Sequence, residues 1–413
     1  MGNYLYYKVV FTCVLIAFLF GGYALESMGI QYVSEGGNLL FKIHLYSYLI
    51  LATFGFLLLN YKLSTIKKNL SDFFVTWFWS LLVLSFVILW GITKFGTSGL
   101  AYLIDTLLTP LLLLAIVCFL NFEQKKKLFT LIGYLFILNC LVALIEFAGK
   151  FHVFETLTGY SNYFRSSAFF SHALNNALVS IAVIPLLLNS TRFSPVFYFA
   201  LSVVALFAFG GRAALAIYLL SSFVIFLPVI YRFITKGIPT SKLRFSLYIA
   251  ASYFIFILLI IAIFETGIAD RIIENMKMEG SANARVDVFY LLEQLSFNEW
   301  LFGASDNLRN AIDVYLGITV IENYLIGWIF TFGLIGAIPL LFSLFYPLYF
   351  FYKKGNWRTK VTILSFIVVS VSNNSLTTKT AVLFFFYLVL LLSYLINTEN
   401  RFKKHNTLSD GVK

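Results

Sequence analysis

The chain has 413 residues, of which 60% are hydrophobic and only 12% are charged, and its mean hydropathy is +0.87. An ordinary soluble domain is roughly 45–50% apolar and about 25% charged, and a single soluble core stops growing at roughly 250–300 residues. The composition therefore predicts a polytopic membrane protein. It excludes a disordered chain, a fibrous repeat and a secreted disulfide scaffold.

A membrane-spanning helix needs about 20 mostly apolar residues, and the sequence offers twelve candidates. The first is expected to be a retained helix and not a signal peptide, since no small-residue cleavage site follows it. A tight hairpin at Gly210 and Gly211 separates the seventh from the eighth. The eleventh is the weakest, because it runs into a polar stretch from Ser370 to Thr380. The candidates, which predict one all-α transmembrane domain over residues 1–413, are 6–25, 39–60, 73–92, 100–120, 128–148, 173–190, 194–210, 212–231, 245–265, 323–350, 361–376 and 380–397.

The basic residues predict the orientation, because Lys and Arg are enriched in cytoplasmic loops. With the N-terminus in the cytoplasm, 20 of the 30 basic residues fall on the inner side, including those of a cytoplasmic basic tail at 398–413. This bias supports twelve helices with both termini inside. It also accounts for most of the net charge of +11, which therefore does not indicate nucleic-acid binding.

One long segment, residues 266–321 between the ninth and tenth helices, is predicted on the outer side. Its first half is polar, and its second half carries apolar residues at helical spacing, among them Leu291, Leu295 and Trp300. We expect two or three short amphipathic helices there, at the membrane interface. A long external segment on a chain with otherwise short loops is the obvious place for function.

Charged side chains within or beside the predicted spans gather on the same outer side. Ionisable groups in a membrane are costly and by default mark functional sites. Their common side favours one polar cavity that opens outward over an ion path through the membrane. The residues concerned are Asp105, Glu146, Arg165, His172, Arg212, Glu265 and Glu322.

Structural roles are the alternative for these residues. Arg165, Arg212 and the loop residue Arg285 are otherwise interfacial anchors or members of structural salt bridges. His172, at a helix start, is otherwise a helix cap. Glu322 is otherwise an acid that favours the positive end of its helix.

Four short patterns occur in an order that resembles a known family. They are Arg165-Ser-Ser-Ala-Phe-Phe-Ser-His172-Ala; Gly211-Arg212-Ala-Ala-Leu; Asn283-Ala-Arg285 followed by Trp300-Leu-Phe-Gly303; and Glu322-Asn-Tyr-Leu followed by Gly333-Leu-Ile-Gly336. They are similar to motifs of the O-antigen polymerase and O-antigen ligase superfamily. Ala168 and Ala173 replace the Gly and Pro of the family's first pattern, which leaves the shape of that turn open. Glu322 stands where ligases usually have His, which favours a polymerase.

The resemblance implies a GT-C-like glycosyltransferase of the bacterial inner membrane. It would join undecaprenyl-diphosphate-linked oligosaccharide repeat units into the O-antigen of lipopolysaccharide, or a related surface polysaccharide, at the periplasmic face. The growing chain would be the donor and a lipid-linked repeat unit the acceptor. The partners that it suggests, besides this lipid-linked sugar and the bilayer, are a chain-length regulator and a flippase.

The implied reaction assigns roles to the residues of these patterns. The leaving diphosphate develops negative charge and needs cations near it, and the planar arginine fork binds phosphate oxygens in pairs. We therefore expect Arg165, Arg212 and Arg285 to bind the diphosphate, with Arg212 also catalytic. The acceptor hydroxyl needs a proton acceptor, for which Glu322 is the first choice and His172 the second. The sequence has no Asp-x-Asp pattern and no metal-ligand cluster, so we expect neither a metal nor another cofactor.

Two other functions stay open. A ligase or a protein O-oligosaccharyltransferase of the same superfamily would move the glycan to lipid A or to a protein. A flippase or transporter of lipid-linked oligosaccharides would share the hydropathy and the outward polar cavity. The lack of an inverted repeat and the long external segment both count against a transporter.

Overall fold

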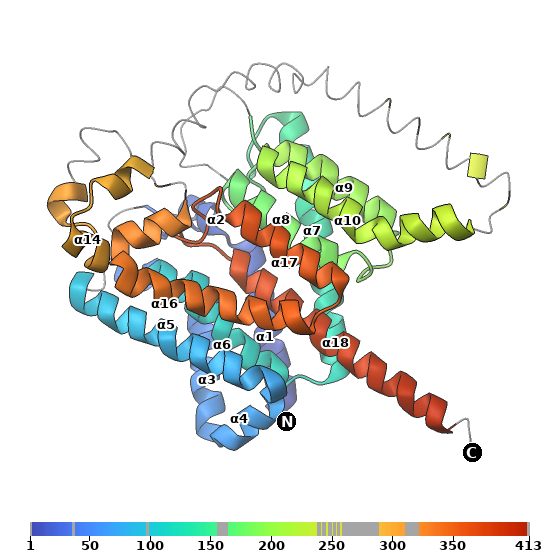
Figure 1. Ribbon diagram of the computed structural model, residues 1–413, viewed down its shortest axis with the longest axis horizontal. Helices are drawn as coiled ribbons and strands as arrows, with labels where there is room; N and C mark the ends of the chain where they lie inside the picture. Colours follow the sequence, from blue (N-terminus) through green and yellow to red (C-terminus); the bar gives the residue numbers. More distant parts are fainter. Residues whose placement is uncertain are drawn as a thin grey trace. The chain divides into compact units, whose positions relative to one another are not determined.

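The structure is a computed structural model in which every regular element of the described residues is helical (Figure 1). It describes residues 2–34, 38–95, 99–154, 164–237, 289–309 and 323–410, together with 241, 245–246, 250, 253, 257 and 321. The all-helical fold class is therefore confirmed. The chain divides into two compact units, one formed by Met1–Ser222 with Leu295–Lys413 and the other by Phe223–Gln294.

The helices follow most of the predicted apolar segments, but the first segment, 6–25, is interrupted at residues 20 and 21, and most of the ninth, 245–265, lies outside the described residues. In the first half of the larger unit they are α1 (Gly2–Leu19), α2 (Gly22–Ser27), α3 (Leu45–Asn60), α4 (Leu63–Leu70), α5 (Phe74–Phe95), α6 (Thr109–Cys118), α7 (Phe122–Gly149), α8 (Ala173–Leu187) and α9 (Pro195–Phe209). Short 3-10 turns at Leu39–Lys42 and Ser71–Phe73 precede α3 and α5, and a π-turn, η3 (Leu103–Leu108), leads into α6.

The second half of the chain forms α10 (Arg212–Lys236), α14 (Phe297–Phe302), α16 (Tyr324–Lys354), α17 (Trp357–Ser370) and α18 (Val382–Asp410). The smaller unit takes α10 from Phe223 onward.

Local side chains explain where several helices begin and end. The side chains of Asn121, Ser194 and Asn356 each accept a backbone N–H in the first turn of α7, α9 and α17, which satisfies donors that a helix start leaves open. Gly210 ends α9 with a left-handed φ of 66°. The hairpin predicted at Gly210 is therefore present, and α10 begins two residues later.

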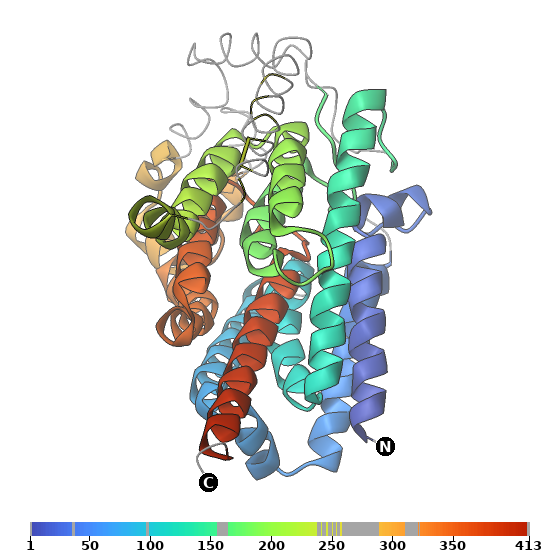
Figure 2. The same cartoon turned by 90° about the vertical axis from the view of Figure 1, so that its right-hand side faces the viewer.

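Helices α8 and α18 form the core of the larger unit. From Val382 to Leu392 every side chain of α18 is at most 1% exposed, and every residue of α8 except Leu174 is buried. The two helices pack against each other, and α18 also packs against α6, α7 and α16 (Figure 2). A helix that is apolar on all sides has to be covered on all sides, and this requirement places α18 inside the unit.

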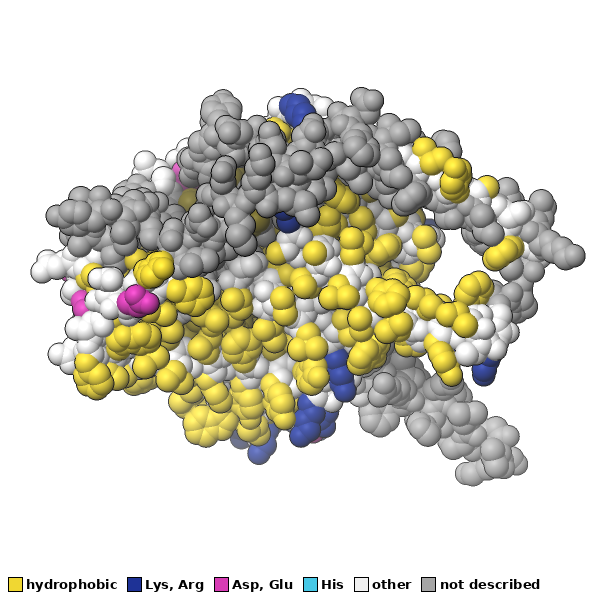
Figure 3. All heavy atoms as spheres, turned by 45° about the horizontal axis from the view of Figure 1, so that its top comes forward, with side chains coloured by type: hydrophobic (Ala, Val, Ile, Leu, Met, Phe, Trp, Pro, Cys, Tyr) yellow, Lys and Arg dark blue, Asp and Glu magenta, His cyan; other side chains and the backbone are white. Residues whose placement is uncertain are grey.

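The outer surface of the helices is apolar. Hydrophobic side chains cover much of the face seen in Figure 3, and exposed large residues run along α5 and α10, for example Leu89 and Leu220. Among the described residues, five helices are long and apolar enough to cross a membrane: Leu63–Lys94, Phe122–Gly149, Arg212–Lys236, Tyr324–Lys354 and Val382–Asn400. The chain therefore has the character of a membrane protein. The number of twelve spans and the orientation remain predictions.

The weak eleventh segment, 361–376, shows where the expected boundaries were wrong. Helix α17 ends at Ser370, and residues 371–381, which we call the polar loop, are not helical apart from turns. Ser375 is fully buried and Asn373 is 3% exposed. The helix stops because these polar side chains bond to neighbouring loop and helix atoms, which competes with helical pairing.

Helix α16 is broken at Gly333, whose φ and ψ of 63° and −176° are not helical. The turn that follows α14 docks at this break: the Ala304 N–H donates to the Phe330 carbonyl at 2.8 Å. A Cβ atom on Gly333 would lie 2.2 Å from the Leu301 carbonyl oxygen, and one on Gly303 would lie 2.3 Å from the Thr331 carbonyl oxygen. Gly303 of the third pattern and Gly333 of the fourth therefore lie side by side. The missing side chain of each glycine lets the backbone of the other segment approach closely.

We predict that Gly303→Ala and Gly333→Ala each destabilise the protein by at least about 2 kcal/mol. Both glycines have positive φ with extended ψ, a region essentially restricted to glycine that costs other residues roughly 1–3 kcal/mol, and the backbone would also have to move. The measurement is thermal unfolding in detergent. Gly55→Ala is the matched control, because this glycine lies in α3 with nothing within 4 Å of its added Cβ and should gain roughly 0.5–1 kcal/mol. Equal unfolding temperatures for all three variants would contradict the packing at the break.

Candidate functional site

The first turn of α8 is the point where the first two arginine patterns meet. Residues 164–172, which we call the motif loop, lead into α8, and the Ser166 N–H donates to the Ala208 carbonyl at the end of α9 at 2.9 Å. The hairpin that follows α9 also touches α8, since a Cβ on Gly211 would lie 2.8 Å from the Ala177 Cβ. The motif loop, α8 and the start of α10 therefore form one local assembly within the larger unit.

A buried carboxylate holds the motif loop. Glu146, at the end of α7, is fully buried. Its Oε2 accepts the Ser166 hydroxyl at 2.5 Å and the N–H groups of Ser167 and Ala168 at 2.9 Å each. Its Oε1 accepts the Val153 N–H at 2.8 Å. A carboxylate is an acceptor with several lone pairs, so one side chain satisfies four donors and fixes the loop next to α7.

The motif loop turns through two residues with positive φ, Ala168 at 37° and Ser171 at 64°. Ala168 stands where the resembled family has glycine, and glycine adopts positive φ most readily. The Glu146 carboxylate bonds to the Ala168 N–H, which offsets the strain of a side chain at this position. The turn that the sequence left open is thus formed in spite of the alanine.

His172 caps α8. Its Nδ1 accepts the Leu174 N–H at 3.2 Å, so in the neutral ring the proton sits on Nε2. Protonation of Nδ1 would remove the cap. The structural alternative considered for this residue is therefore observed, and the geometry argues against His172 as the proton acceptor.

The two arginines of these patterns lie on either side of the loop–hairpin contact. Arg165 directly precedes Ser166, and Arg212 opens α10, shortly after Ala208. Arg165 is half-buried and Arg212 is exposed. The contact thus places both arginine positions on adjacent segments. The predicted residues Arg285, Glu322 and Glu265 lie outside the described residues, so their roles remain predictions.

Side-chain amides extend the site into the core. Asn176 is fully buried, and its Nδ2 donates to the carbonyls of Ser167 and His172. Within the described part of the chain its Oδ1 has no hydrogen-bond partner, and neither does the Nδ2 of Asn139. Ser375 of the polar loop donates to Asn175 Oδ1 at 2.5 Å. The polar loop is thereby tied to the same turn of α8.

Asp105 is bonded within a cluster of its own, although it was predicted to share one outward polar cavity with the arginines. It is fully buried in η3. Its Oδ2 accepts the Tyr32 hydroxyl at 2.7 Å, and both oxygens accept the His44 N–H, at 3.1 and 3.2 Å. The carboxylate instead anchors the segment between α2 and α3. Lys379, whose Nζ donates to the Tyr32 carbonyl at 2.5 Å, joins the same cluster.

Tyr32, His44 and Lys379 are not among the site residues predicted from the sequence. Tyr32 lies in the segment that connects α2 to α3, where nothing in the sequence indicates burial. His44 had one signal, since it lies within the predicted span 39–60. Lys379 had one signal, a lysine within a polar stretch between two apolar segments. An ionisable residue at such a place is a functional candidate.

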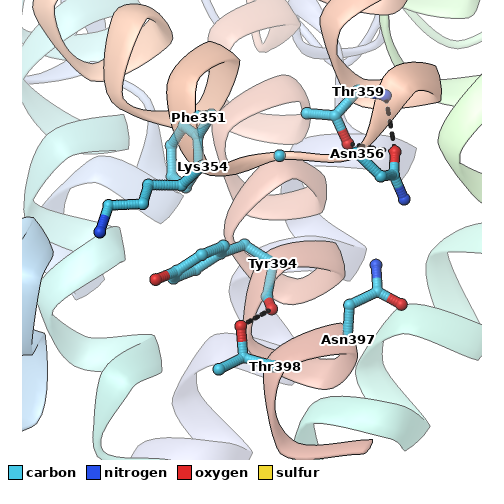
Figure 4. A pocket seen from close by; sticks show the side chains of 8 residues that line it. Phe351, Lys354, Asn356, Thr359, Tyr394, Asn397 and Thr398 are labelled. Carbon is cyan, nitrogen blue, oxygen red and sulfur yellow. Dashed lines mark hydrogen bonds between the residues drawn. The ribbon is translucent and has the colours of Figure 1, made fainter. Parts of the chain in front are cut away.

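A small pocket with a volume of about 30 Å³ lies at the C-terminal end of α16 (Figure 4). In it, Asn356 Oδ1 accepts the Thr359 N–H at 2.9 Å as the cap of α17. Lys354, at its edge, pairs with Asp72 at 2.9 Å. None of the residues of the four patterns lines this pocket, which adjoins the connection between α16 and α17. It is therefore not the candidate site. It is lined by Phe351, Lys354, Gly355, Asn356, Thr359, Tyr394, Asn397 and Thr398.

The described residues contain no group of three or more His, Cys, Asp or Glu side chains that could hold a metal ion. In comparisons with known proteins, no protein-family model and no curated protein matches the chain. The assignment of the site therefore rests on the four patterns and on the contacts that join the segments carrying them.

We predict that Glu146→Leu destabilises the protein by at least about 2–3 kcal/mol, because leucine has no acceptor and leaves the buried N–H donors of the motif loop without a partner. Amide hydrogen exchange at Ser167 and Ala168 should speed up before global unfolding. Glu123→Leu, at an exposed residue of the same helix, is the control and should change stability by less than about 0.5 kcal/mol. Unchanged exchange at both amides in Glu146→Leu would show that the carboxylate does not hold the loop.

Proposed function

We propose that the protein is a glycosyltransferase that joins undecaprenyl-diphosphate-linked oligosaccharide repeat units into a surface polysaccharide at the periplasmic face of the bacterial inner membrane. The observation that carries the proposal is the 2.9 Å hydrogen bond from Ser166 to Ala208. It joins the segment of the first arginine pattern to the segment of the second. Separate patterns of one family's active site are expected to come together in space.

The position of Arg165 and Arg212 supports diphosphate binding. The hydrogen bond from Ser166 to Ala208 brings the two arginine positions onto adjacent segments. A diphosphate carries the negative charge that two arginines bind, and the arginine fork binds its oxygens in pairs. In the proposed reaction the two residues also stabilise the leaving diphosphate as its charge develops, and Arg285 contributes from the segment 266–321.

The apolar surface supports a lipid-linked substrate. An undecaprenyl chain partitions into the bilayer. Five described helices are long and apolar enough to cross a bilayer, so the first turn of α8 belongs to a chain with the character of a membrane protein. The site combines this setting with buried amide groups at Asn176 and Asn139 that keep hydrogen-bonding capacity. An amide oxygen such as Asn176 Oδ1 accepts a sugar hydroxyl, and an amide NH₂ such as that of Asn139 donates to a phosphate oxygen.

A deletion strain tests the class of function. Loss of a polymerase should leave surface glycans with at most one repeat unit, and single lipid-linked repeats should accumulate at the outer face. Loss of a flippase would trap the same intermediates at the inner face, and loss of a ligase would leave long chains on the lipid carrier. Long polymer of unchanged length distribution in the deletion strain would end the proposal.

We predict that Arg165→Ala and Arg212→Ala lower polymerisation by about 10²–10³-fold, like removal of one donor to a developing anion. The Lys variants should keep part of the activity, since lysine keeps the charge and loses the fork. The assay uses purified protein with lipid-linked repeat units, at equal yields of folded protein.

Arg192→Ala is the matched control for these variants. Arg192 is an exposed arginine beyond the far end of α8, outside the proposed site, so this variant should polymerise normally. Near-normal activity of both Arg165→Ala and Arg212→Ala would remove the diphosphate site.

A further inference from the structure

Lys379 of the polar loop lies against a small cavity beneath the motif loop. Its Nζ donates to the Tyr32 carbonyl at 2.5 Å and lies 4.7 Å from the centre of the Tyr32 ring. The residues that line the cavity include Lys379 and Thr380 of the polar loop and Phe170 and Ser171 of the motif loop. The lysine and the segment that ends at His172 therefore border the same cavity.

The cavity has a volume of about 20 Å³, which is enough for one water molecule but not for a sugar or a diphosphate. Its polar lining also includes His44 and Tyr32. A water with several polar neighbours of this kind is held in place and relays protons. The size of the cavity therefore argues against Lys379 as a direct ligand of a phosphate group.

Other acid–base groups around the site are already engaged in the described structure. Glu146 accepts four hydrogen bonds that hold the motif loop, and Asp105 accepts bonds from Tyr32 and His44. Nδ1 of His172 caps α8, and Nδ1 of His44 caps α3. Protonation of any of these atoms would break a contact that supports the fold.

Lys379 differs, because its deprotonated amine keeps the bond to Tyr32. A neutral amine still donates N–H to the carbonyl and has a lone pair left for a proton. The residue lies outside the membrane-spanning helices, in the connection between α17 and α18. Burial lowers the pKa of its ammonium group to about 8, with a further lowering by Lys42, although the carboxylates of Asp105 and Glu26 oppose the shift. With this pKa, roughly a tenth of the Lys379 side chains are neutral at pH 7, far more than for an ordinary lysine with a pKa of about 10.4.

We propose that Lys379 is the proton acceptor of the glycosyl transfer, and that a single water in the cavity connects it to the acceptor hydroxyl. This inference rests on the proposed function. As the hydroxyl oxygen forms its bond to the anomeric carbon, the bond from that carbon to the diphosphate oxygen breaks and the diphosphate leaves with the electron pair. The hydroxyl proton passes to the water, and the water gives one of its protons to the Lys379 amine.

The decisive variant is Lys379→Arg, which keeps the charge and a donor to Tyr32 but cannot act as a base. Polymerisation should fall by about 10²-fold or more, the usual contribution of general base catalysis. In the wild type the rate should rise about tenfold per pH unit up to a pH near 8 and then level off, because only the neutral amine accepts a proton. The pH dependence of the residual rate in the variant should lack this step.

Lys379→Ala provides a second test that does not depend on how the arginine packs. It leaves space beside the cavity, and added ethylamine should restore activity more strongly at higher pH if an amine base is what is missing. Lys42→Arg is the matched control: Lys42 is a neighbouring lysine whose Nζ donates to the Gln31 and Ser34 carbonyls, and this variant should keep normal activity. Thermal unfolding establishes that each variant is folded.

The outcomes separate the two proposals. If the wild type makes no polymer from lipid-linked repeats, the proposed function fails and this inference fails with it. If the wild type polymerises and folded Lys379→Arg does so equally well with the same pH profile, Lys379 is only an anchor of the polar loop and the inference is overturned. Loss of activity in Glu322→Gln together with full activity in Lys379→Arg would assign the base to Glu322 instead.

Discussion

Irregular backbone that is packed among apolar helices must find hydrogen-bond partners within the protein, because a bilayer supplies none. The described structure meets this constraint at three places, each with a different device. Glu146 accepts the donors of the motif loop. Thr106 accepts the Thr380 N–H and donates to the Thr378 carbonyl of the polar loop. At the break of α16, the Phe330 and Thr331 carbonyls accept hydrogen bonds from the Ala304 N–H and the Arg309 guanidinium group, respectively.

These devices explain why the candidate site is located at the first turn of α8. The motif loop and the polar loop both reach this turn, the first through Asn176 and the second through Asn175. Each loop is fixed by a side chain of another helix, so its backbone is held before any substrate binds. A preorganised arrangement is what electrostatic stabilisation of a leaving group requires. Fixing the two loops in this way buries a group of polar atoms inside an apolar core, which lowers stability unless each atom is hydrogen-bonded.

Much of the helical framework was predictable from the sequence, because apolar length alone specifies where helices lie in such a chain. The predicted segments 128–148 and 212–231 correspond to α7 and α10 with small shifts at their ends. The resemblance also placed the arginine patterns on segments that the structure brings into contact. Three points escaped prediction: the early end of α17 at Ser370, the pairing of Gly303 with Gly333 and the burial of Lys379 beside Tyr32. The last two depend on contacts between residues far apart in the chain, whereas the end of α17 follows from the polar stretch that begins at Ser370.

Composition and periodicity by themselves determined that the protein is an all-helical membrane protein, and the order of short patterns pointed to a class of chemistry. Apolar length is a local property, and it survives in any arrangement of the helices. Only the tertiary structure decided what several polar residues do: that Glu146 holds a loop, that Asp105 bonds to Tyr32 and that Lys379 lines a cavity. Hydrogen bonding inside an apolar core depends on which donors and acceptors the packing brings within about 3 Å, and no local pattern in the chain contains this information.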